Sequence, residues 1–166
     1  MIVADSGPII AFARLGRLDL LRQVVGELAI PDAVYDELVV KGKGRPGAEE
    51  VERGGWIRRK AVRDQMAIVQ PPSELDQGER EAIMLAQELG VMLLVDEWKV
   101  RKAAVPLGIE VFGVLRVLAE AKRRGFIPKV RPIIEELLAI GYWMHETRVI
   151  RPFLREIGEE EAKAEE

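Results

Sequence analysis

Short apolar runs that end at turn-forming residues recur along the chain and predict the strands of a sheet. Each run is only a few residues long, and Asp, Gly or Pro closes it, as expected for strands buried on both faces. The predicted strands cover residues 1–5, 28–30, 66–69, 91–95 and 109–112.

Segments with apolar positions three or four residues apart lie between these runs and predict helices. The predicted helices cover residues 9–15, 18–25, 48–53, 114–124 and 130–140, with others starting at residue 31 and ending at residues 89 and 104. Strands that alternate with helices favour right-handed crossovers and parallel pairing. We therefore expect an α/β fold, a three-layer α/β/α domain with a central, mainly parallel sheet of about five strands.

Length and composition predict one domain and limit the chemistry. The chain has 166 residues and 48% apolar residues, so residues 1–158 can form a single domain with its own core, followed by an acidic, solvated tail at 159–166. The sequence contains no cysteine and a single histidine, His145. Disulfides and sulfur-based zinc sites are therefore excluded. Because there is no run of about 18 apolar residues and no basic, hydrophobic leader, we expect a cytoplasmic protein without a membrane segment.

Acidic residues fall where the predicted strands end. Asp5 and Asp96 each close a strand, and the carboxyl ends of parallel strands form the edge where ligands bind. Glu37 and Glu79 lie near the starts of helices that begin at the same edge. Carboxylates held close together repel one another unless a cation neutralises them. Since hard divalent ions prefer carboxylate and water oxygens, we predict a site for Mg²⁺ or Mn²⁺.

Each of these acids also has an ordinary explanation. Asp5 and Asp96 precede helices, where Asp is favoured as an N-cap. Glu79 offsets the positive end of a helix dipole, and Glu37 is explained as a solvated helix residue. These explanations do not account for all of the acids meeting at one sheet edge, so we favour the metal site.

The segments that carry the acids resemble those of the PIN-domain family of metal-dependent ribonucleases, which includes the VapC-type toxins of prokaryotic toxin–antitoxin pairs. Residues 3–6 are similar to the family's first strand, residues 30–37 to the segment with its second acid, and residues 93–96 to the strand with its fourth. The helix of Glu79 is similar to the one that bears the third acid, where Asp is commoner. The order and spacing match from residue 1 to about residue 112, and the later helices resemble a poorly characterised prokaryotic branch.

The resemblance implies a PIN-like fold and divalent-metal-dependent cleavage of RNA. In-line attack by activated water would leave a 5′-phosphate and a 3′-hydroxyl. Asp5 and Asp96 would be direct metal ligands, and Glu37 and Glu79 would complete the coordination or orient water. The expected partners are RNA, a second copy of the chain in a homodimer and, for a toxin, an antitoxin protein.

Other polar residues are auxiliary candidates near these acids. Glu81 is a rival to Glu79 as the third acid, and Glu97 is a fifth carboxylate. Ser6 is expected to donate a hydrogen bond at the metal or the phosphate. Arg101, about one turn beyond Asp96, is expected to pair with Glu97 rather than with phosphate.

Two other functions remain open from the sequence. One is a nucleic-acid-binding or regulatory PIN-like module with weak catalysis. The other is a small-molecule phosphohydrolase with Asp5 as nucleophile, although Ser6-Gly7-Pro8 lacks the second Asp that such enzymes commonly carry. The basic runs at 58–63 and 122–131 are interpreted as ordinary solvated charge. The tryptophans, Trp56, Trp98 and Trp143, are expected in a core or an interface rather than as base readers.

Overall fold

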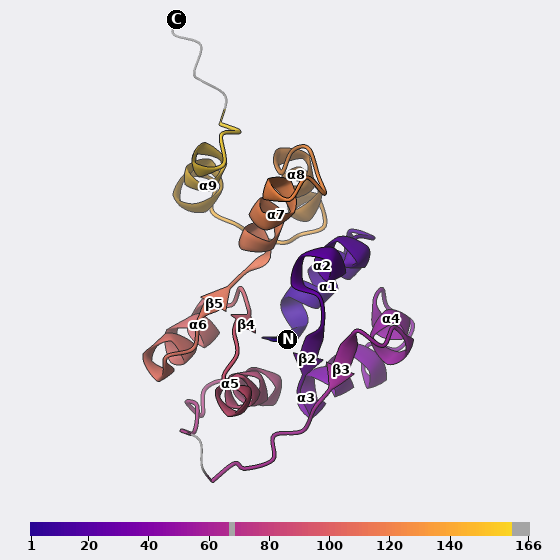
Figure 1. The fold of residues 1–166 in the computed structure, drawn as a ribbon, viewed down its shortest axis with the longest axis vertical. Helices are drawn as coiled ribbons and strands as arrows, with labels where there is room; N and C mark the ends of the chain where they lie inside the picture. Colours follow the sequence, from indigo (N-terminus) through magenta and orange to yellow (C-terminus); the bar gives the residue numbers. More distant parts are fainter. Residues whose placement is uncertain (67–68, 161–166) are drawn as a thin grey trace, which may run out of the picture.

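The strands form one fully parallel sheet in the order β3-β2-β1-β4-β5 (Figure 1). This computed structural model describes residues 1–66 and 69–160. The strands are β1 (Ile2–Ala4), β2 (Leu28–Ile30), β3 (Ile57–Arg59), β4 (Leu93–Leu94) and β5 (Val111–Phe112). The predicted α/β class with a five-stranded parallel sheet is therefore confirmed.

The edge strand β3 differs from the prediction. The sequence indicated a strand at 66–69, but Met66 and Val69 lie in a turn and in irregular chain and are exposed, while residues 67 and 68 lie outside the described residues. In β3 only Ile57 is buried. Its two arginines form ion pairs across the sheet edge, Arg58 with Glu27 at 2.8 Å and Arg59 with Asp32 at 2.6 Å. The positive charge of the basic run at 58–60 is therefore partly neutralised by these ion pairs, and charged side chains at a sheet edge oppose pairing with another strand.

Alternation along the strands divides the core into two layers. Ala4, Leu28 and Leu94 point to one face and join a large apolar cluster. Val3 and Leu93 point to the other face and join a second cluster with α5 and α6. Successive strand residues point to opposite faces of the sheet, and each face carries a buried apolar cluster. The sheet is therefore covered on both sides and forms the middle of three layers.

The helices on the first face are α1 (Ser6–Arg14), α2 (Leu18–Val25), α4 (Ala48–Arg53), α7 (Val114–Arg123), α8 (Arg131–Ala139) and α9 (Arg151–Glu156). Those on the second face are α5 (Gln77–Leu89) and α6 (Trp98–Ala104), and the short α3 (Asp32–Tyr35) contacts α5. A π-helical turn (Asp36–Val40) continues α3, another (Glu146–Ile150) precedes α9, and a 3-10 turn (Val105–Leu107) follows α6. The helix α9 was not predicted.

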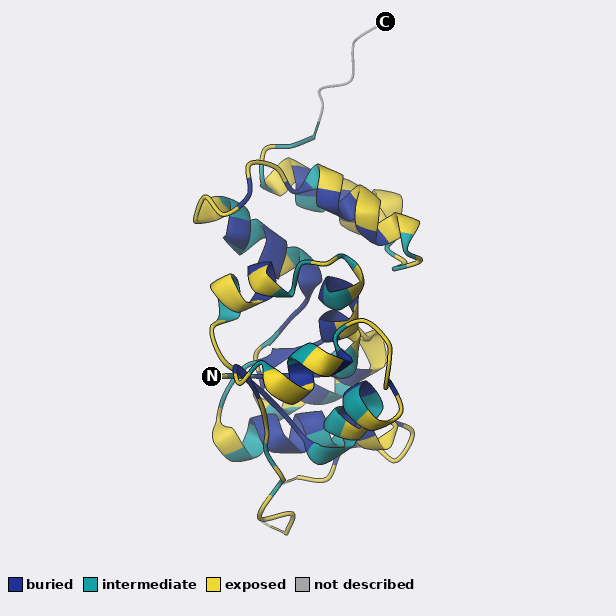
Figure 2. Ribbon diagram, turned by 90° about the vertical axis from the view of Figure 1, so that its right-hand side faces the viewer, coloured by how far each residue is buried: buried dark blue, intermediate teal, exposed yellow. Residues whose placement is uncertain are grey.

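The last helices form a lobe at one end of the sheet, with the described C-terminus beyond it (Figures 1 and 2). Residue Glu159, the first of the predicted acidic tail, accepts hydrogen bonds from the backbone N–H groups of Val130 and Arg131 and pairs with Lys122 at 3.1 Å. The first acid of that run is thus bound to the lobe. None of the described helices has the length and apolarity needed to cross a membrane.

Candidate functional site

Asp5 lies directly after β1 at the carboxyl edge of the sheet and is 7% exposed. Its backbone N–H donates to the Leu94 carbonyl at 3.0 Å, which fixes it beside β4. It occupies the N-cap position of α1, but its side chain makes no capping hydrogen bond. Capping therefore does not explain this carboxylate.

The electrostatic surroundings of Asp5 are unfavourable for a lone carboxylate. Burial raises the pKa of Asp5 to about 7; the Ser6 backbone N–H opposes this increase, and the negative charges of Glu37, Glu79 and Asp76 add to it. No cationic side chain within residues 1–66 and 69–160 forms an ion pair with it. The site therefore holds several acids around a buried one, a distribution that a cation would stabilise.

Glu37 reaches this group from the π-helical turn that follows α3. Burial raises its pKa, and a hydrogen bond from the Ser6 side chain opposes that increase. The expected donor Ser6 thus binds Glu37. A Cβ atom on Gly78 would lie 2.4 Å from Glu37 Oε1, so a glycine at this position in α5 leaves the space that the carboxylate occupies.

Glu79 lies in the first turn of α5 and is 8% exposed. It forms a capping box with Asp76: the Glu79 N–H donates to Asp76 Oδ1 at 2.8 Å, and the Asp76 N–H donates to Glu79 Oε2 at 2.9 Å. Lys99 Nζ approaches its other oxygen at 3.4 Å. By contrast, Glu81 accepts the Ala33 N–H at 2.7 Å and so points to α3. The negative charge of Glu79 acts on Asp5, whereas Glu81 caps a helix.

Asp96, which follows β4, is held by groups from the C-terminal part of the chain. Its Oδ2 accepts the Val114 N–H at 3.1 Å and a short hydrogen bond from the Tyr142 hydroxyl. Burial, followed by the negative charge of Asp96, raises the pKa of Tyr142, so its phenol remains protonated and donates. A Cβ on Gly113 would lie 1.9 Å from Asp96 Oδ1, which makes this glycine part of the site.

Arg101 is bound differently from the expectation. Its Nε donates to the Val95 carbonyl at 3.0 Å, and its Nη2 lies 3.8 Å from Asp96 Oδ1. The predicted pairing with Glu97 was therefore wrong, because the guanidinium turns back toward the strand end. Glu97 is exposed and lines the cleft next to Asp96.

The donors fit a hard divalent ion in their chemistry, since each is a carboxylate. Their positions are not those of a closed coordination sphere: among the described residues, no three acidic or histidine side chains are arranged to hold a metal ion. In this arrangement Glu79 is bound by Lys99 and the Asp76 cap, and Asp96 is bound by Tyr142 and lies near Arg101. For a shared ion, the Glu79 side chain would have to turn away from Lys99 and from the Asp76 cap.

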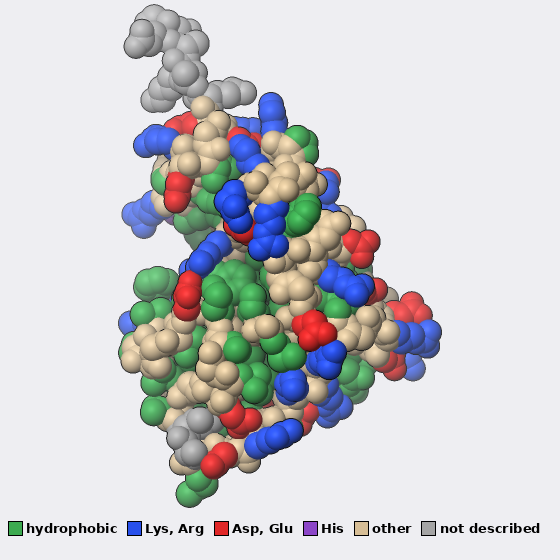
Figure 3. Space-filling view, in the orientation of Figure 1, with side chains coloured by type: hydrophobic (Ala, Val, Ile, Leu, Met, Phe, Trp, Pro, Cys, Tyr) green, Lys and Arg blue, Asp and Glu red, His purple; other side chains and the backbone are tan. Residues whose placement is uncertain are grey.

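A cleft of about 1080 Å³ opens from these acids toward the C-terminal lobe. Asp5, Glu79 and Asp96 lie on its wall, together with two tryptophans that are strongly exposed, Trp98 (73%) and Trp143 (79%). Trp56 packs in the core as expected, but these two do not. On the face shown in Figure 3, charges of both signs are scattered without a continuous basic stripe.

Several residues of the site were not identified from the sequence: Asp76, Gly78, Gly113 and Tyr142. Gly113 carried a usable signal, because it directly follows β5 and so stands at the same sheet edge as Asp5 and Asp96. Tyr142 carried none, since its contact joins residues 46 positions apart.

Comparison with known proteins agrees with this architecture. The sequence matches the family model of the PIN domain over residues 1–159. The fold is similar to that of a PilT N-terminus domain protein from the hyperthermophilic archaeon Sulfolobus solfataricus P2, with a TM-score of 0.55, 20% identity, and coverage of 73% of this chain and 93% of that chain. No curated protein gave a match. The match over nearly the whole chain shows that the protein belongs to the PIN-domain family.

Proposed function

We propose that the protein is a divalent-metal-dependent endoribonuclease. Membership of the PIN-domain family indicates a nuclease-type function in general. The observation that carries the proposal for this chain is the buried Asp5, which has acidic neighbours and no cationic partner in the described part of the chain. A Mg²⁺ or Mn²⁺ ion is the natural counter-charge for such a group.

The acids would divide the work according to their positions. Asp5 and Asp96 would hold the ion, and Glu37 and Glu79 would complete the coordination through water or orient the attacking water. A bound ion lowers the pKa of a water molecule and neutralises charge on the phosphodiester. Attack of water on phosphorus would break the bond to the 3′-oxygen, which would take up a proton, so the products would be a 5′-phosphate and a 3′-hydroxyl. Ser6 would orient Glu37, to which it is hydrogen-bonded.

The size of the cleft favours a polymeric substrate rather than a small phosphate ester. Its volume of about 1080 Å³ lies slightly above the ~300–1,000 Å³ typical of small-ligand sites. The turn after Asp5 also lacks a second acid two residues on. A toxin role with an antitoxin partner, and a homodimer, are further proposals that rest on the family.

Cleavage assays with amide variants of the site acids, and of Glu81 as a control, test the proposal. We expect cleavage of single-stranded RNA with Mn²⁺ or Mg²⁺, none with EDTA, and a loss of at least ~100-fold in Asp96→Asn and Glu79→Gln, because metal-assisted charge stabilisation is worth several kcal/mol. Glu81→Gln is the matched control and should keep its activity, since its side chain caps α3 and glutamine still offers an oxygen.

The outcomes separate the rival functions. Equal activity in all variants would place the chemistry elsewhere. RNA binding without cleavage by metal-loaded wild type would favour a binding module. This is the second candidate because Lys99 and Arg101 already lie beside Glu79 and Asp96 as counter-charges. Hydrolysis of a chromogenic phosphate ester without RNA cleavage would favour the phosphohydrolase.

The exposed tryptophans of the cleft should bind unpaired bases. Stacking of a base on an aromatic ring is worth about 1–3 kcal/mol. We therefore expect Trp98→Ala and Trp143→Ala each to weaken binding of a single-stranded RNA about tenfold, measured by fluorescence anisotropy in EDTA. Phe126→Ala, which removes another exposed aromatic ring that does not line the cleft, is the control. Unchanged affinity in both tryptophan variants would instead indicate a protein partner for this surface.

A further inference from the structure

The carboxylate of Asp96 is held asymmetrically. Both of its hydrogen bonds, from the Val114 N–H and from the Tyr142 hydroxyl, go to Oδ2. Within the described chain, Oδ1 accepts no hydrogen bond; it lies beside Gly113, and Arg101 Nη2 is 3.8 Å away. One oxygen is therefore fixed by protein donors, and the other keeps its lone pairs for a ligand.

The backbone places Tyr142 firmly at the end of α8. Gly141 adopts a left-handed conformation with φ of 89°. Its N–H donates to the Leu138 carbonyl at 3.1 Å, and the Tyr142 N–H donates to the Leu137 carbonyl at 3.0 Å. This pair of bonds is the Schellman motif, so the position of Tyr142 follows from the way the helix terminates.

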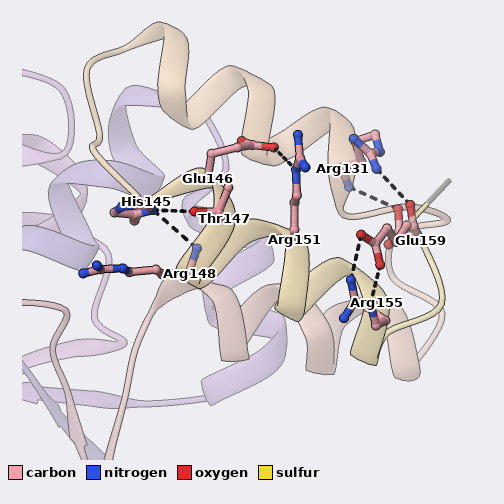
Figure 4. A network of polar contacts seen from close by, with 9 residues as sticks. Arg131, His145, Glu146, Thr147, Arg148, Arg151, Arg155 and Glu159 are labelled. Carbon is pink, nitrogen blue, oxygen red and sulfur yellow. Dashed lines mark hydrogen bonds and ion pairs between the residues drawn. The ribbon is translucent and has the colours of Figure 1, made fainter. Parts of the chain in front are cut away.

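The chain beyond Tyr142 is held as well. The ring of His145 accepts a hydrogen bond from the Arg148 N–H at 3.3 Å and caps the π-helical turn (Figure 4). Glu146 pairs with Arg151 at 3.3 Å, which ties that turn to α9 (Figure 4). The Tyr142 phenol is thus presented to Asp96 by a segment held on both sides.

We propose that Tyr142 is a positioning residue of the metal centre, which orients Asp96 so that its Oδ1 can ligate the ion. This inference rests on the proposed function, because it assigns the free oxygen to the metal. Hydrogen-bonded partners of ligating carboxylates fix their orientation, and their loss typically costs ~10–100-fold in metal affinity or activity. The C-terminal lobe would then complete the site formed by the sheet edge.

The test measures Mn²⁺ affinity without RNA, by electron paramagnetic resonance of free Mn²⁺. We expect Tyr142→Phe, which keeps the ring and removes the donor, to bind Mn²⁺ at least ~10-fold more weakly than wild type. Tyr35→Phe is the matched control, because the Tyr35 hydroxyl makes no hydrogen bond with the described residues and its ring contacts Arg59. In the Asp96→Asn background, Tyr142→Phe should have no further effect, which shows that it acts through Asp96.

Opposite results would overturn the inference. Tighter Mn²⁺ binding by Tyr142→Phe would mean that the phenol competes with the ion, and an unchanged affinity would mean that the bond is only structural. The nuclease proposal and the positioning role of Tyr142 can fail separately. If Tyr142→Phe binds Mn²⁺ more weakly than wild type but neither wild type nor the variant cleaves RNA, the nuclease is rejected and the positioning role of Tyr142 stands. Absence of Mn²⁺ binding by wild type would reject the metal centre and the positioning role together.

Discussion

Replacing Asp5 by Asn should stabilise the EDTA-treated protein by about 2–4 kcal/mol at pH 8 and should abolish metal-dependent cleavage. The pKa of Asp5 is about 7 in the folded protein, against 3.8 for an ordinary Asp. The folded state therefore binds a proton more tightly than the unfolded state, and the difference corresponds to about 4 kcal/mol above pH 7. Asparagine has nearly the same shape and no charge, so it removes this penalty.

The sign of the effect fixes its pH dependence. Below about pH 4, Asp5 is protonated in both states and costs nothing. Between the two pKa values the unfolded chain loses its proton first, so wild-type stability falls as pH rises, and the cost is complete above pH 7. The stability gain of Asp5→Asn should therefore grow from pH 4 to pH 8, measured by urea unfolding at both values.

Added Mn²⁺ provides the internal control for this variant. The ion should stabilise wild type at pH 8, because it binds only the folded site, and should leave Asp5→Asn unchanged. Wild type should also release protons on binding Mn²⁺ near pH 6, which calorimetry in buffers of different ionisation enthalpy detects. A gain of equal size at pH 4 and pH 8 would show that packing, and not the charge of Asp5, sets the stability.

Much of this fold follows from local patterns because most of its strands are apolar on both faces. The runs at β1, β2, β4 and β5 are buried in the middle of three layers and had to be hydrophobic. The edge strand β3 buries only Ile57, and its arginines make it resemble a loop in the sequence. An edge strand pairs with a single neighbouring strand and has less of its surface covered, so it does not need a continuous run of apolar residues that could identify it in the sequence.

The same distinction applies to the candidate site. Asp5 and Asp96 could be predicted because each closes a strand, and parallel strands bring their ends together. The choice between Glu79 and Glu81 required the structure, since both lie within the first half of α5 and are separated by their surroundings: Glu79 is buried near Asp5, and Glu81 contacts Ala33. Tyr142 depends on how the C-terminal lobe docks, which no local pattern encodes.

A second large effect is expected at Gly113, where a single methyl group should displace Asp96. Its backbone is extended, with φ of −122° and ψ of −172°, so alanine is conformationally allowed there. The added Cβ would lie 1.9 Å from Asp96 Oδ1 and 2.6 Å from Arg101 Nη2, well below the 3.0 Å that real Cβ contacts observe. Both atoms are at the ends of side chains, so the side chains rotate and the backbone stays.

Gly113→Ala should therefore weaken Mn²⁺ binding and RNA cleavage by at least ~10-fold, because Asp96 leaves its hydrogen-bonded orientation. The free energy of unfolding should fall by only about 1–3 kcal/mol, the cost of lost hydrogen bonds to a charged group. Gly7→Ala is the matched control for Mn²⁺ binding, since among the described residues no atom beyond its chain neighbours and its own helix backbone lies within 4 Å of its added Cβ. Normal Mn²⁺ affinity in folded Gly113→Ala would mean that Asp96 does not bind the metal in the orientation seen here, and equal losses in both variants would point to helix packing instead.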